Sequence, residues 1–247
     1  SSDVIINNVD MSFDGDGAND FQGEAAAVLV SGDSTTTIKN SYIETAGVIR
    51  TAAAAKENGI LQIQNSVVFA SEGNDTDDEY EALVVPMMKR TPFALGLEGT
   101  IRATFALGLE GVVRATNVLG AGQGIYSNSM IVSTGWGVLS TDSGKSGTHA
   151  LDVSNVVAGI GEVEVAKSGK VYDATRTVDG VTYGYTYEED YSGYVAYADS
   201  GVYDTFDSVE FYSPDYIQIM ASNTSSAYYE DSYLYSGRIA VMTQQNN

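Results

Sequence analysis

The 247-residue chain contains no cysteine. Disulfide bonds, cysteine-ligated zinc and a thiol nucleophile are therefore excluded together, and the redox compartment stays undecided. Histidine occurs once, as His149 in the stretch SGKSGTHA. A Ser-His-Asp triad there would need partners that no motif supplies, so we expect a structural or solvated role for this side chain. No catalytic residue is predicted.

Positive charge is also scarce, because 12 Lys and Arg stand against 33 Asp and Glu and give a formal charge of −21. Such a chain repels polyanions, so we expect no nucleic-acid partner. No apolar run approaches the roughly 20 residues of a membrane-spanning helix, and no signal peptide is present, so we expect no membrane insertion. The chain opens with Ser-Ser-Asp instead of Met, and we expect a mature form or a piece of a longer chain.

Helical periodicity is almost absent outside Ala52 to Glu57, whereas short alternating runs of Val, Ile, Thr, Tyr and Phe are broken by Gly, Ser, Asn and Asp. This pattern predicts an all-β chain. One six-residue phrase recurs along the chain. Its positions are, in order, an apolar residue, any residue, Asn/Asp/Ser, Ser/Val, any residue and a second apolar residue. The third position of the phrase falls at Asn8, Asn40, Asn65, Asn128, Asn155, Ser208 and Asp231.

The spacings between these positions are, in chain order, 32, 25, 63, 27, 53 and 23. Counting 53 as two periods, and 63 as two periods plus a 12-residue addition, gives a mean of about 26, which predicts a parallel β-solenoid. The short polar residue would take a left-handed bend and hydrogen-bond to its equivalent one coil away. The residues expected in buried, stacked columns are Ile38, Ile43, Ile63, Val68, Ile131 and Val153. A β-sandwich with irregularly spaced turns stays as the alternative.

The phrases TTTIKNSYIETAG, LQIQNSVVFASEG and GIYSNSMIVSTGWGVLSTDSG are the most informative about family. They resemble right-handed parallel β-helix proteins of the pectate-lyase-like superfamily, and more closely the secreted or surface adhesin-like β-helix proteins of gut-dwelling Gram-positive bacteria. The resemblance implies a right-handed β-helix and an extracellular or cell-surface location. It is specific for the fold and says little about activity, because many members of that group have no established reaction.

We expect residues 1–247 to form a single β-helix domain with two additions. Residues 93–116 hold two copies of a 12-residue segment that differ only at Thr100/Val112 and Ile101/Val113. Twelve residues cannot close a coil, so the extra copy is expected to lengthen one. It is either a recent duplication, or an engineered or reconstruction artefact, or a functional arm. Residues 172–205 form a Tyr-rich insertion that interrupts the phrase.

Acidic residues near the start of the chain suggest a cation site. In FDGDGANDFQGE, oxygens from Asp14, Asp16, Asp20 and Glu24 could converge on calcium. The pattern departs from an EF-hand loop at Ala18, Asn19 and Ala25, and a solvated acidic loop is the alternative. No other cofactor is expected.

The Tyr-rich insertion is the predicted ligand surface, since inserted loops often carry binding and Tyr faces suit sugars or protein partners. The candidate residues are Tyr183, Tyr185, Tyr187, Tyr191 and Tyr194, and stacked Tyr ladders that stabilise the coils are the alternative reading.

The favoured function is a non-catalytic, adhesin-like binding or display module, with a glycan or surface protein as partner. One alternative is a carbohydrate-active enzyme of the polysaccharide-lyase type, with Arg102, Arg114 or Arg238 as base. The other alternative is a self-assembling sheath or filament subunit, formed by end-to-end association of uncapped coils.

Overall fold

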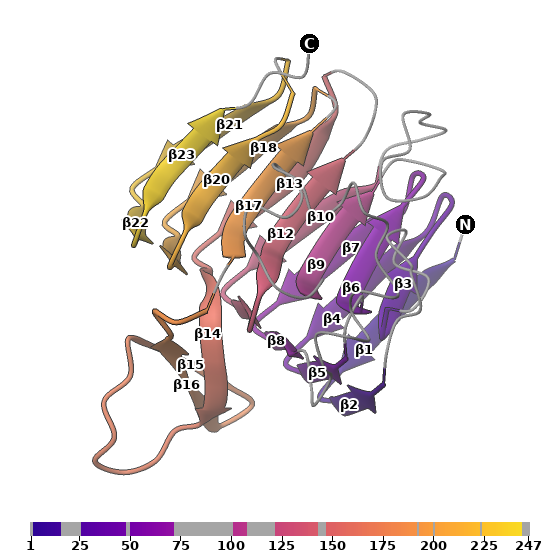
Figure 1. Cartoon of the computed structure of the whole chain (residues 1–247). Coiled ribbons are helices and arrows are strands. Elements are labelled where there is room, and N and C mark those ends of the chain that lie inside the picture. The colour runs from indigo at the N-terminus through magenta and orange to yellow at the C-terminus, as the bar shows by residue number, and fades with distance from the viewer. Residues whose placement is uncertain are drawn as a thin grey trace.

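The computed structural model describes residues 2–15, 26–47, 50–71, 101–107, 122–142, 147–191, 193–199, 201–222 and 224–243. Within these ranges the chain forms strands and no helix, so the prediction of an all-β chain is confirmed. It follows that no described helix has the length and apolar character needed to cross a membrane. The strands build three sheets of mostly parallel strands, which run side by side (Figure 1).

Each sheet takes one strand in turn from the chain. Sheet A contains β1 (Asp3–Asn7), β4 (Thr35–Lys39), β7 (Ile60–Gln64), β10 (Gln123–Ser127), β13 (His149–Ser154), β18 (Tyr203–Asp207) and β21 (Ser226–Glu230). Sheet B contains β2 (Asp10–Asp14), β5 (Tyr42–Ala46), β8 (Val67–Ser71), β11 (Met130–Ser133), β14 (Val157–Val165), β19 (Glu210–Ser213) and β22 (Tyr233–Ser236). Sheet C contains β3 (Val28–Val30), β6 (Arg50–Lys56), β9 (Ile101–Leu107), β12 (Trp136–Asp142), β17 (Gly193–Asp199), β20 (Tyr216–Met220) and β23 (Ile239–Thr243). The remaining strands, β15 (Ala174–Val178) and β16 (Val181–Tyr187), form an antiparallel hairpin beside β14.

We call one set of consecutive strands from sheets A, B and C a repeat. Every strand of sheet A pairs with the sheet A strand of the next repeat, in parallel and in chain order. The same order holds in sheets B and C. The described strands are therefore arranged in a manner consistent with a β-solenoid.

The interpretation of the two long intervals as double periods was wrong. Asn65 and Asn128 follow β7 and β10, which pair directly, and Asn155 and Ser208 follow β13 and β18, which also pair directly. Each interval is therefore one repeat that has been lengthened. The hairpin accounts for much of the second lengthening, because its two strands lie between β14 and β17 in the chain.

The tandem 12-residue copies contribute one described strand. β9 takes its first residues from the first copy and its last residues, from Phe105, from the second copy. It pairs with β6 on one side and β12 on the other, so this strand is an ordinary member of sheet C. The rest of residues 93–116 lies outside the described ranges.

The corner after each sheet A strand is built as the sequence predicts. All seven phrase positions, from Asn8 to Asp231, have φ between 46° and 56°, the left-handed region that short polar side chains tolerate best. Asn65 Nδ2 donates to Asn40 Oδ1 at 2.6 Å, and Asn155 Nδ2 donates to Asn128 Oδ1 at 2.7 Å. The expected ladder between equivalent residues is therefore confirmed at these two steps. Between the first and second repeats, Asn40 Nδ2 donates to Asn7 Oδ1 at 3.0 Å, and not to Asn8, which is the equivalent of Asn40 in the first repeat.

A second ladder, which the sequence analysis missed, runs through the serine that follows the corner residue. Ser66 Oγ accepts a hydrogen bond from Ser41 N at 3.1 Å and donates to Gln64 O at 2.8 Å. Ser129 Oγ repeats both bonds one step later, with Ser66 N and Ser127 O. The hydroxyl thus accepts from the backbone N–H of the previous repeat and adds a second hydrogen bond to a carbonyl that already accepts from the corner residue of that repeat, as Gln64 O does from Asn40 N.

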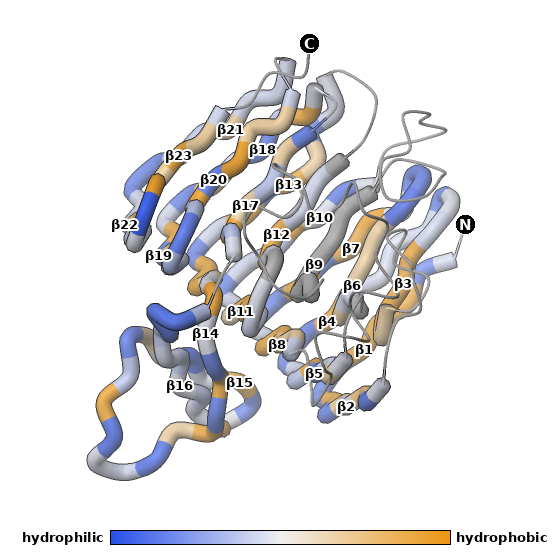
Figure 2. Tube along the Cα trace, in the orientation of Figure 1, coloured by the Kyte–Doolittle hydropathy of each residue, from blue (hydrophilic) through white to orange (hydrophobic). Residues whose placement is uncertain are grey.

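The core lies inside the three sheets, and the residues expected there are buried. Ile38, Ile63, Tyr126 and Val153 occupy matching positions on paired strands of sheet A. Ile43, Val68 and Ile131 do the same in sheet B. All six residues predicted to form buried columns are fully shielded from solvent. Figure 2 shows hydrophobic residues recurring along strands such as β4, β8 and β11.

One acidic side chain is buried in this core. Asp204 of β18 is 1% exposed and accepts hydrogen bonds from Leu151 N at 3.1 Å and Thr141 Oγ1 at 3.2 Å. The Thr141 hydroxyl also lies 3.0 Å from Tyr197 O, although it has only one hydrogen to donate. A protonated Asp204 resolves this conflict, because its own O–H can donate to Thr141, which then donates to Tyr197 O. Burial raises the pKa of Asp204 to about 7.

Truncation of the core column should be strongly destabilising. Replacing Ile63 by Ala leaves a cavity between neighbouring strands, so Ile63→Ala should lower the free energy of unfolding by about 2 to 4 kcal/mol in urea denaturation. Gln64→Ala, on an exposed neighbour in the same strand, should change it by less than about 0.5 kcal/mol. Equal effects of the two substitutions would contradict the assignment of the core.

The buried acid predicts a pH dependence of stability. Its pKa is raised in the folded state, so the unfolded chain ionises first, and stability should fall as pH rises from about 4 to about 7. Asp204→Asn mimics the protonated acid, since its amide can donate to Thr141 and its oxygen can accept from Leu151. The variant should gain stability over the wild type as pH rises, by on the order of 4 kcal/mol at pH 8.

Urea denaturation of the two proteins between pH 4 and pH 8 measures this gain. Asp207→Asn is the matched control, because Asp207 lies on the same strand but is exposed. The gain in stability with rising pH should be larger for Asp204→Asn than for this control. A difference between Asp204→Asn and the wild type that stays constant with pH would contradict the raised pKa of Asp204.

Candidate functional site

The hairpin of β15 and β16 is the largest departure from the repeat among the described residues. Asp179 and Gly180 connect its strands, both with positive φ, at 48° and 81°. Two residues of this kind between paired Val178 and Val181 are typical of a tight type I′ turn, whose twist matches that of a hairpin. β16 pairs with the far half of β14, from Gly161 to Val165, in antiparallel fashion.

One face of the hairpin covers the outer face of sheet B. There the outward-facing residues of three successive repeats are apolar and buried, whereas an uncovered parallel sheet would carry polar residues on its outside. They pack against the hairpin's Val178 and Tyr185. The outward-facing residues are Val67, Phe69, Met130, Val132 and Val157.

Specific contacts hold the hairpin in place. Tyr185 is fully buried and donates its hydroxyl hydrogen to Ile160 O at 2.7 Å. Its ring lies against Gly159, where a side-chain Cβ would come within 2.3 Å of Tyr185 Oη, so only glycine fits. Arg176 Nη2 donates to Asn155 O at 2.9 Å and Oδ1 at 3.1 Å. The hairpin is thus tied both to sheet B and to the asparagine ladder.

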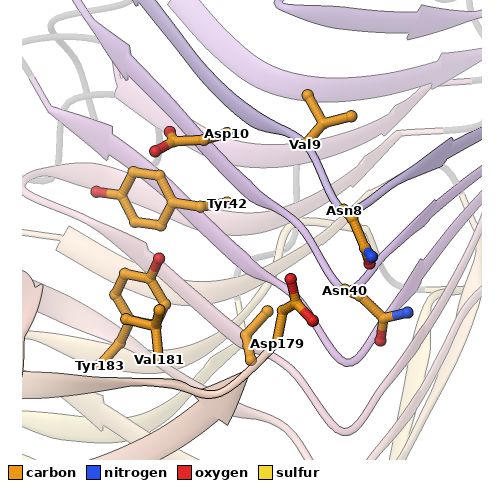
Figure 3. Close-up of a pocket in the computed structure, with 9 residues that line it drawn as sticks. Asn8, Val9, Asp10, Asn40, Tyr42, Asp179, Val181 and Tyr183 are labelled. Carbon is orange, nitrogen blue, oxygen red and sulfur yellow. The ribbon is translucent and has the colours of Figure 1, made fainter.

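A cleft of about 180 Å³ lies between the hairpin turn and the first two repeats (Figure 3). The Tyr42 and Tyr183 rings stack at 5.0 Å with an interplanar angle of 11°. This stack joins β5 to β16, two segments that lie far apart in the chain. The complete lining is Asn8, Val9, Asp10, Asn40, Tyr42, Val178, Asp179, Val181 and Tyr183.

The chemistry of the cleft is that of a small aromatic and acidic surface. Tyr42 donates its hydroxyl hydrogen to Glu44 Oε2 at 3.1 Å, and burial together with Glu44 raises the pKa of Tyr42. Burial and the charge of Asp10 raise the pKa of Tyr183. Both phenols therefore stay neutral and can offer rings and hydroxyls. The cleft is smaller than the usual pocket for a drug-sized molecule, so it suits one sugar ring or one side group better than a large cofactor.

The structure separates the five tyrosines predicted to bind a ligand. Tyr183 lines the cleft, and half-buried Tyr187 meets Tyr235 edge-on at 5.3 Å on β22. Tyr191 donates to Glu162 Oε1 at 2.5 Å. Tyr185 and Tyr194 are buried, so neither offers surface to a ligand here. Of the segment 172–205, residues 174–187 form the hairpin, and β17 and β18 belong to sheets C and A.

The predicted calcium site lies mostly outside the described ranges. Asp14 is exposed at the end of β2, whereas Asp16, Asp20 and Glu24 fall in a stretch whose structure is not described. In the part of the chain that is described, no three His, Asp or Glu side chains group so as to hold a metal ion. Calcium binding therefore stays a prediction.

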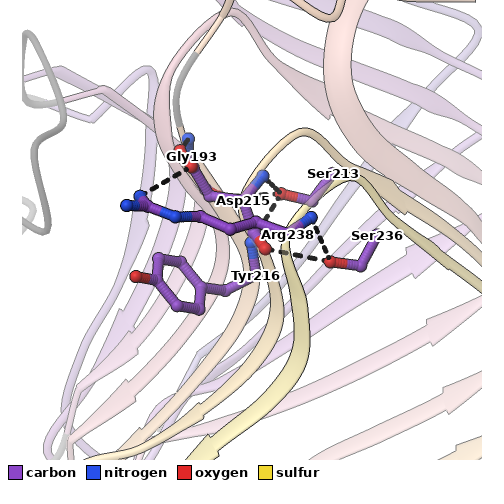
Figure 4. Close-up of polar contacts among 6 residues, drawn as sticks. All are labelled: Gly193, Ser213, Asp215, Tyr216, Ser236 and Arg238. Atoms are coloured by element: carbon purple, nitrogen blue, oxygen red, sulfur yellow. Dashed lines mark hydrogen bonds and ion pairs between the residues drawn. The ribbon is translucent and has the colours of Figure 1, made fainter.

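Arg238, one of the arginines considered as a lyase base, takes part in an ion pair and hydrogen bonds that hold the fold together (Figure 4). Its Nη1 lies 3.3 Å from Asp215 Oδ1, and Asp215 Oδ2 accepts a hydrogen bond from Gly193 N at 3.1 Å. Ser213 and Ser236 hydroxyls complete this corner between sheets B and C. The arginine thus ties two repeats together. The side chain of Arg102 and all of Arg114 lie outside the description.

His149, the single histidine, is also held by neighbours. Its ring stacks on Tyr203 at 4.4 Å, and Nε2 lies 3.0 Å from Thr205 Oγ1. Both partners belong to β18, the strand that pairs with β13. The contacts fit the structural role expected for His149.

Two signals in the sequence could have located the cleft. The stretch TVDGVTY holds an Asp-Gly pair between alternating residues, which is a strong hairpin signal. The unbroken apolar runs VVFA and MIV, in place of alternation, indicate strands buried on both faces. Together they predict a hairpin that covers part of a sheet. Neither signal identifies Asp10 or Tyr42, which depend on where the hairpin ends in space.

No protein-family model, no curated protein and no solved structure matches this chain.

Proposed function

We propose that this chain is a non-catalytic binding module whose cleft takes one sugar unit of a glycan. The observation that carries the proposal is the stacked pair Tyr42 and Tyr183, held between two separate parts of the chain and bordered by amide and carboxylate groups. Aromatic rings pack against the apolar faces of sugars, and amide and carboxylate oxygens accept hydrogen bonds from sugar hydroxyls.

The finer description of the fold belongs to this proposal. We take the three sheets to be the faces of a single right-handed parallel β-helix, as in the pectate-lyase-like proteins that the sequence resembles. The strict alternation of sheets A, B and C and the identical left-handed corner in seven repeats support it. The shortest intervals between corners, such as those from Asn40 to Asn65 and from Asn128 to Asn155, support coils of about 26 residues when nothing is inserted.

An extracellular or cell-surface, adhesin-like role fits the same features. A stack of repeats presents a long side face, on which weak contacts to neighbouring sugars of a surface glycan, or to a surface protein, add through multivalency. The formal charge of −21 disfavours acidic polysaccharides as ligands.

End-to-end self-association is a second candidate, favoured by apolar side chains on the first and last described repeats. Val4 and Ile5 are 50% and 65% exposed, and Ile239 and Val241 are 42% and 52% exposed. Strands β1 and β23 also present open sheet edges, which tend to pair with another chain. An apparent mass that rises with concentration in sedimentation would support this candidate, and a constant monomer mass would contradict it.

Removal of one ring should abolish most binding in the cleft. A glycan array identifies a bound oligosaccharide, and calorimetry then compares variants. Tyr183→Ala should weaken binding about tenfold, because it removes half of the aromatic wall. Tyr228→Ala is the matched control, since Tyr228 is 60% exposed on β21 and does not line the cleft. The Tyr228→Ala variant should bind the oligosaccharide with the affinity of the wild type.

Two outcomes would contradict the proposal: no glycan bound by the wild-type protein, or equal affinity in Tyr183→Ala and the wild type. Melting temperatures of both variants must first match that of the wild type, so that lost binding is not lost folding.

A further inference from the structure

The cleft between the hairpin turn and the first repeats carries charge of one sign. Asp10 contributes a carboxylate from β2, and Asp179 contributes another from the hairpin turn. None of the nine described residues that line the cleft is Lys, Arg or His. Figure 3 shows the Asp10 carboxylate next to the Tyr42 ring and the Asp179 carboxylate on the side of Asn40. The two acids therefore belong to separate parts of the lining.

The surroundings add to the negative potential. Asp10 and Tyr42 occupy matching positions on paired strands of sheet B, so the carboxylate lies beside the ring of the next repeat. Glu44 lies two residues beyond Tyr42 on the same strand and accepts its hydroxyl hydrogen. Burial and then the charge of Asp10 raise the pKa of Tyr183, and burial and Glu44 raise the pKa of Tyr42, with a smaller contribution from Asp10. The ring stack is thus embedded in a field that favours a cation.

Aromatic rings favour a cation as well. The face of a tyrosine ring attracts an ammonium group that lies within about 6 Å of its centre. A carboxylate next to the same ring adds a charge-assisted hydrogen bond. Rings and carboxylates without any competing basic side chain form a surface that distinguishes an ammonium group from a neutral amide or hydroxyl.

We propose that the cleft selects a saccharide unit that bears a protonated amino group, an amino sugar, with the ammonium at the Tyr42 and Tyr183 stack, in the negative potential of the Asp10 and Asp179 carboxylates. This inference rests on the proposed function and specifies its ligand class. The sugar ring packs on the aromatic wall, and the ammonium supplies the charge that the lining lacks.

Three oligosaccharides of equal length and linkage test the inference, since they differ only at one substituent. The probes are a glucosamine oligomer with free amino groups, its fully N-acetylated form, and the corresponding glucose oligomer. Calorimetry at low salt should give the glucosamine oligomer at least about fivefold tighter binding than the other two. This advantage should shrink when the salt concentration is raised, because charge pairs at exposed sites are screened.

Variants assign the preference to the two acids. Asp10→Asn and Asp179→Asn should each reduce the affinity for the glucosamine oligomer by about threefold to tenfold, with little change for the glucose oligomer. Glu189→Gln removes the same charge from an exposed residue that follows the hairpin outside the cleft, and it should leave the preference intact. Tyr183→Ala should weaken binding of all three probes.

The outcomes separate the inference from the function on which it rests. Equal binding of the three probes, lost in Tyr183→Ala, would overturn the amino-sugar preference and leave glycan binding in the cleft supported. A glucosamine preference that survives both Asp10→Asn and Asp179→Asn, or that Glu189→Gln abolishes, would also overturn the inference. Binding of none of the probes, together with an empty glycan array, would overturn the proposed function itself.

Discussion

The left-handed corner after each strand of sheet A is the constraint on which the rest of the structure depends. In that conformation the chain turns from sheet A into sheet B within two residues, and it does so at the same height in every repeat. Corner amides bond between equivalent residues at two steps of the stack, and where serine follows the corner its hydroxyl accepts from the backbone N–H of the previous repeat. Because these bonds join equivalent residues of neighbouring repeats, they fix the register of sheets A and B. Each apolar side chain then falls over its equivalent in the core.

This constraint acts locally, and that explains why repeats of very different length stack together. The short interval from Asn40 to Asn65 and the long one from Asn65 to Asn128 each close one repeat. A repeat can therefore hold additional residues, and the described example leaves the stack after sheet B and returns in sheet C. The hairpin is such an excursion. β14 runs past the edge of sheet B, pairs with β16, and the chain comes back as β17. The excursion is stabilised by burying apolar residues that the outside of sheet B would otherwise expose, at about 25 cal/mol for each Å² covered.

The sequence predicts the elements that repeat and fails where the chain departs from the repeat. The corner positions from Asn8 to Asp231, the buried columns through Ile63 and Ile131, and the all-β class follow from periodicity, because each rests on a local pattern that recurs. The number of repeats does not follow. The interval between the corners at 155 and 208 is as compatible with two short coils as with one coil and a hairpin, since length alone does not distinguish a strand of the stack from an excursion. The Asp-Gly pair at 179 and 180 was the signal that could have decided between them.

The cleft is even harder to predict from the sequence than the number of repeats, because its residues come together only in three dimensions. Tyr183 could be selected from composition, but Tyr42, Asp10 and Asn40 belong to ordinary repeats and look like any outward-facing residues in the sequence. They line one cleft because the hairpin extends back over earlier repeats and ends at the first two, where sheet B changes from apolar to polar on its outside. Arg176, which pairs with Tyr183, and the contact of Tyr185 with Gly159, which lies further from the turn, fix the hairpin in that position. The hairpin therefore contributes one half of the cleft as a rigid element, while the corner ladder holds the other half. A ligand would meet walls that are already formed, so little binding energy would be spent on ordering them.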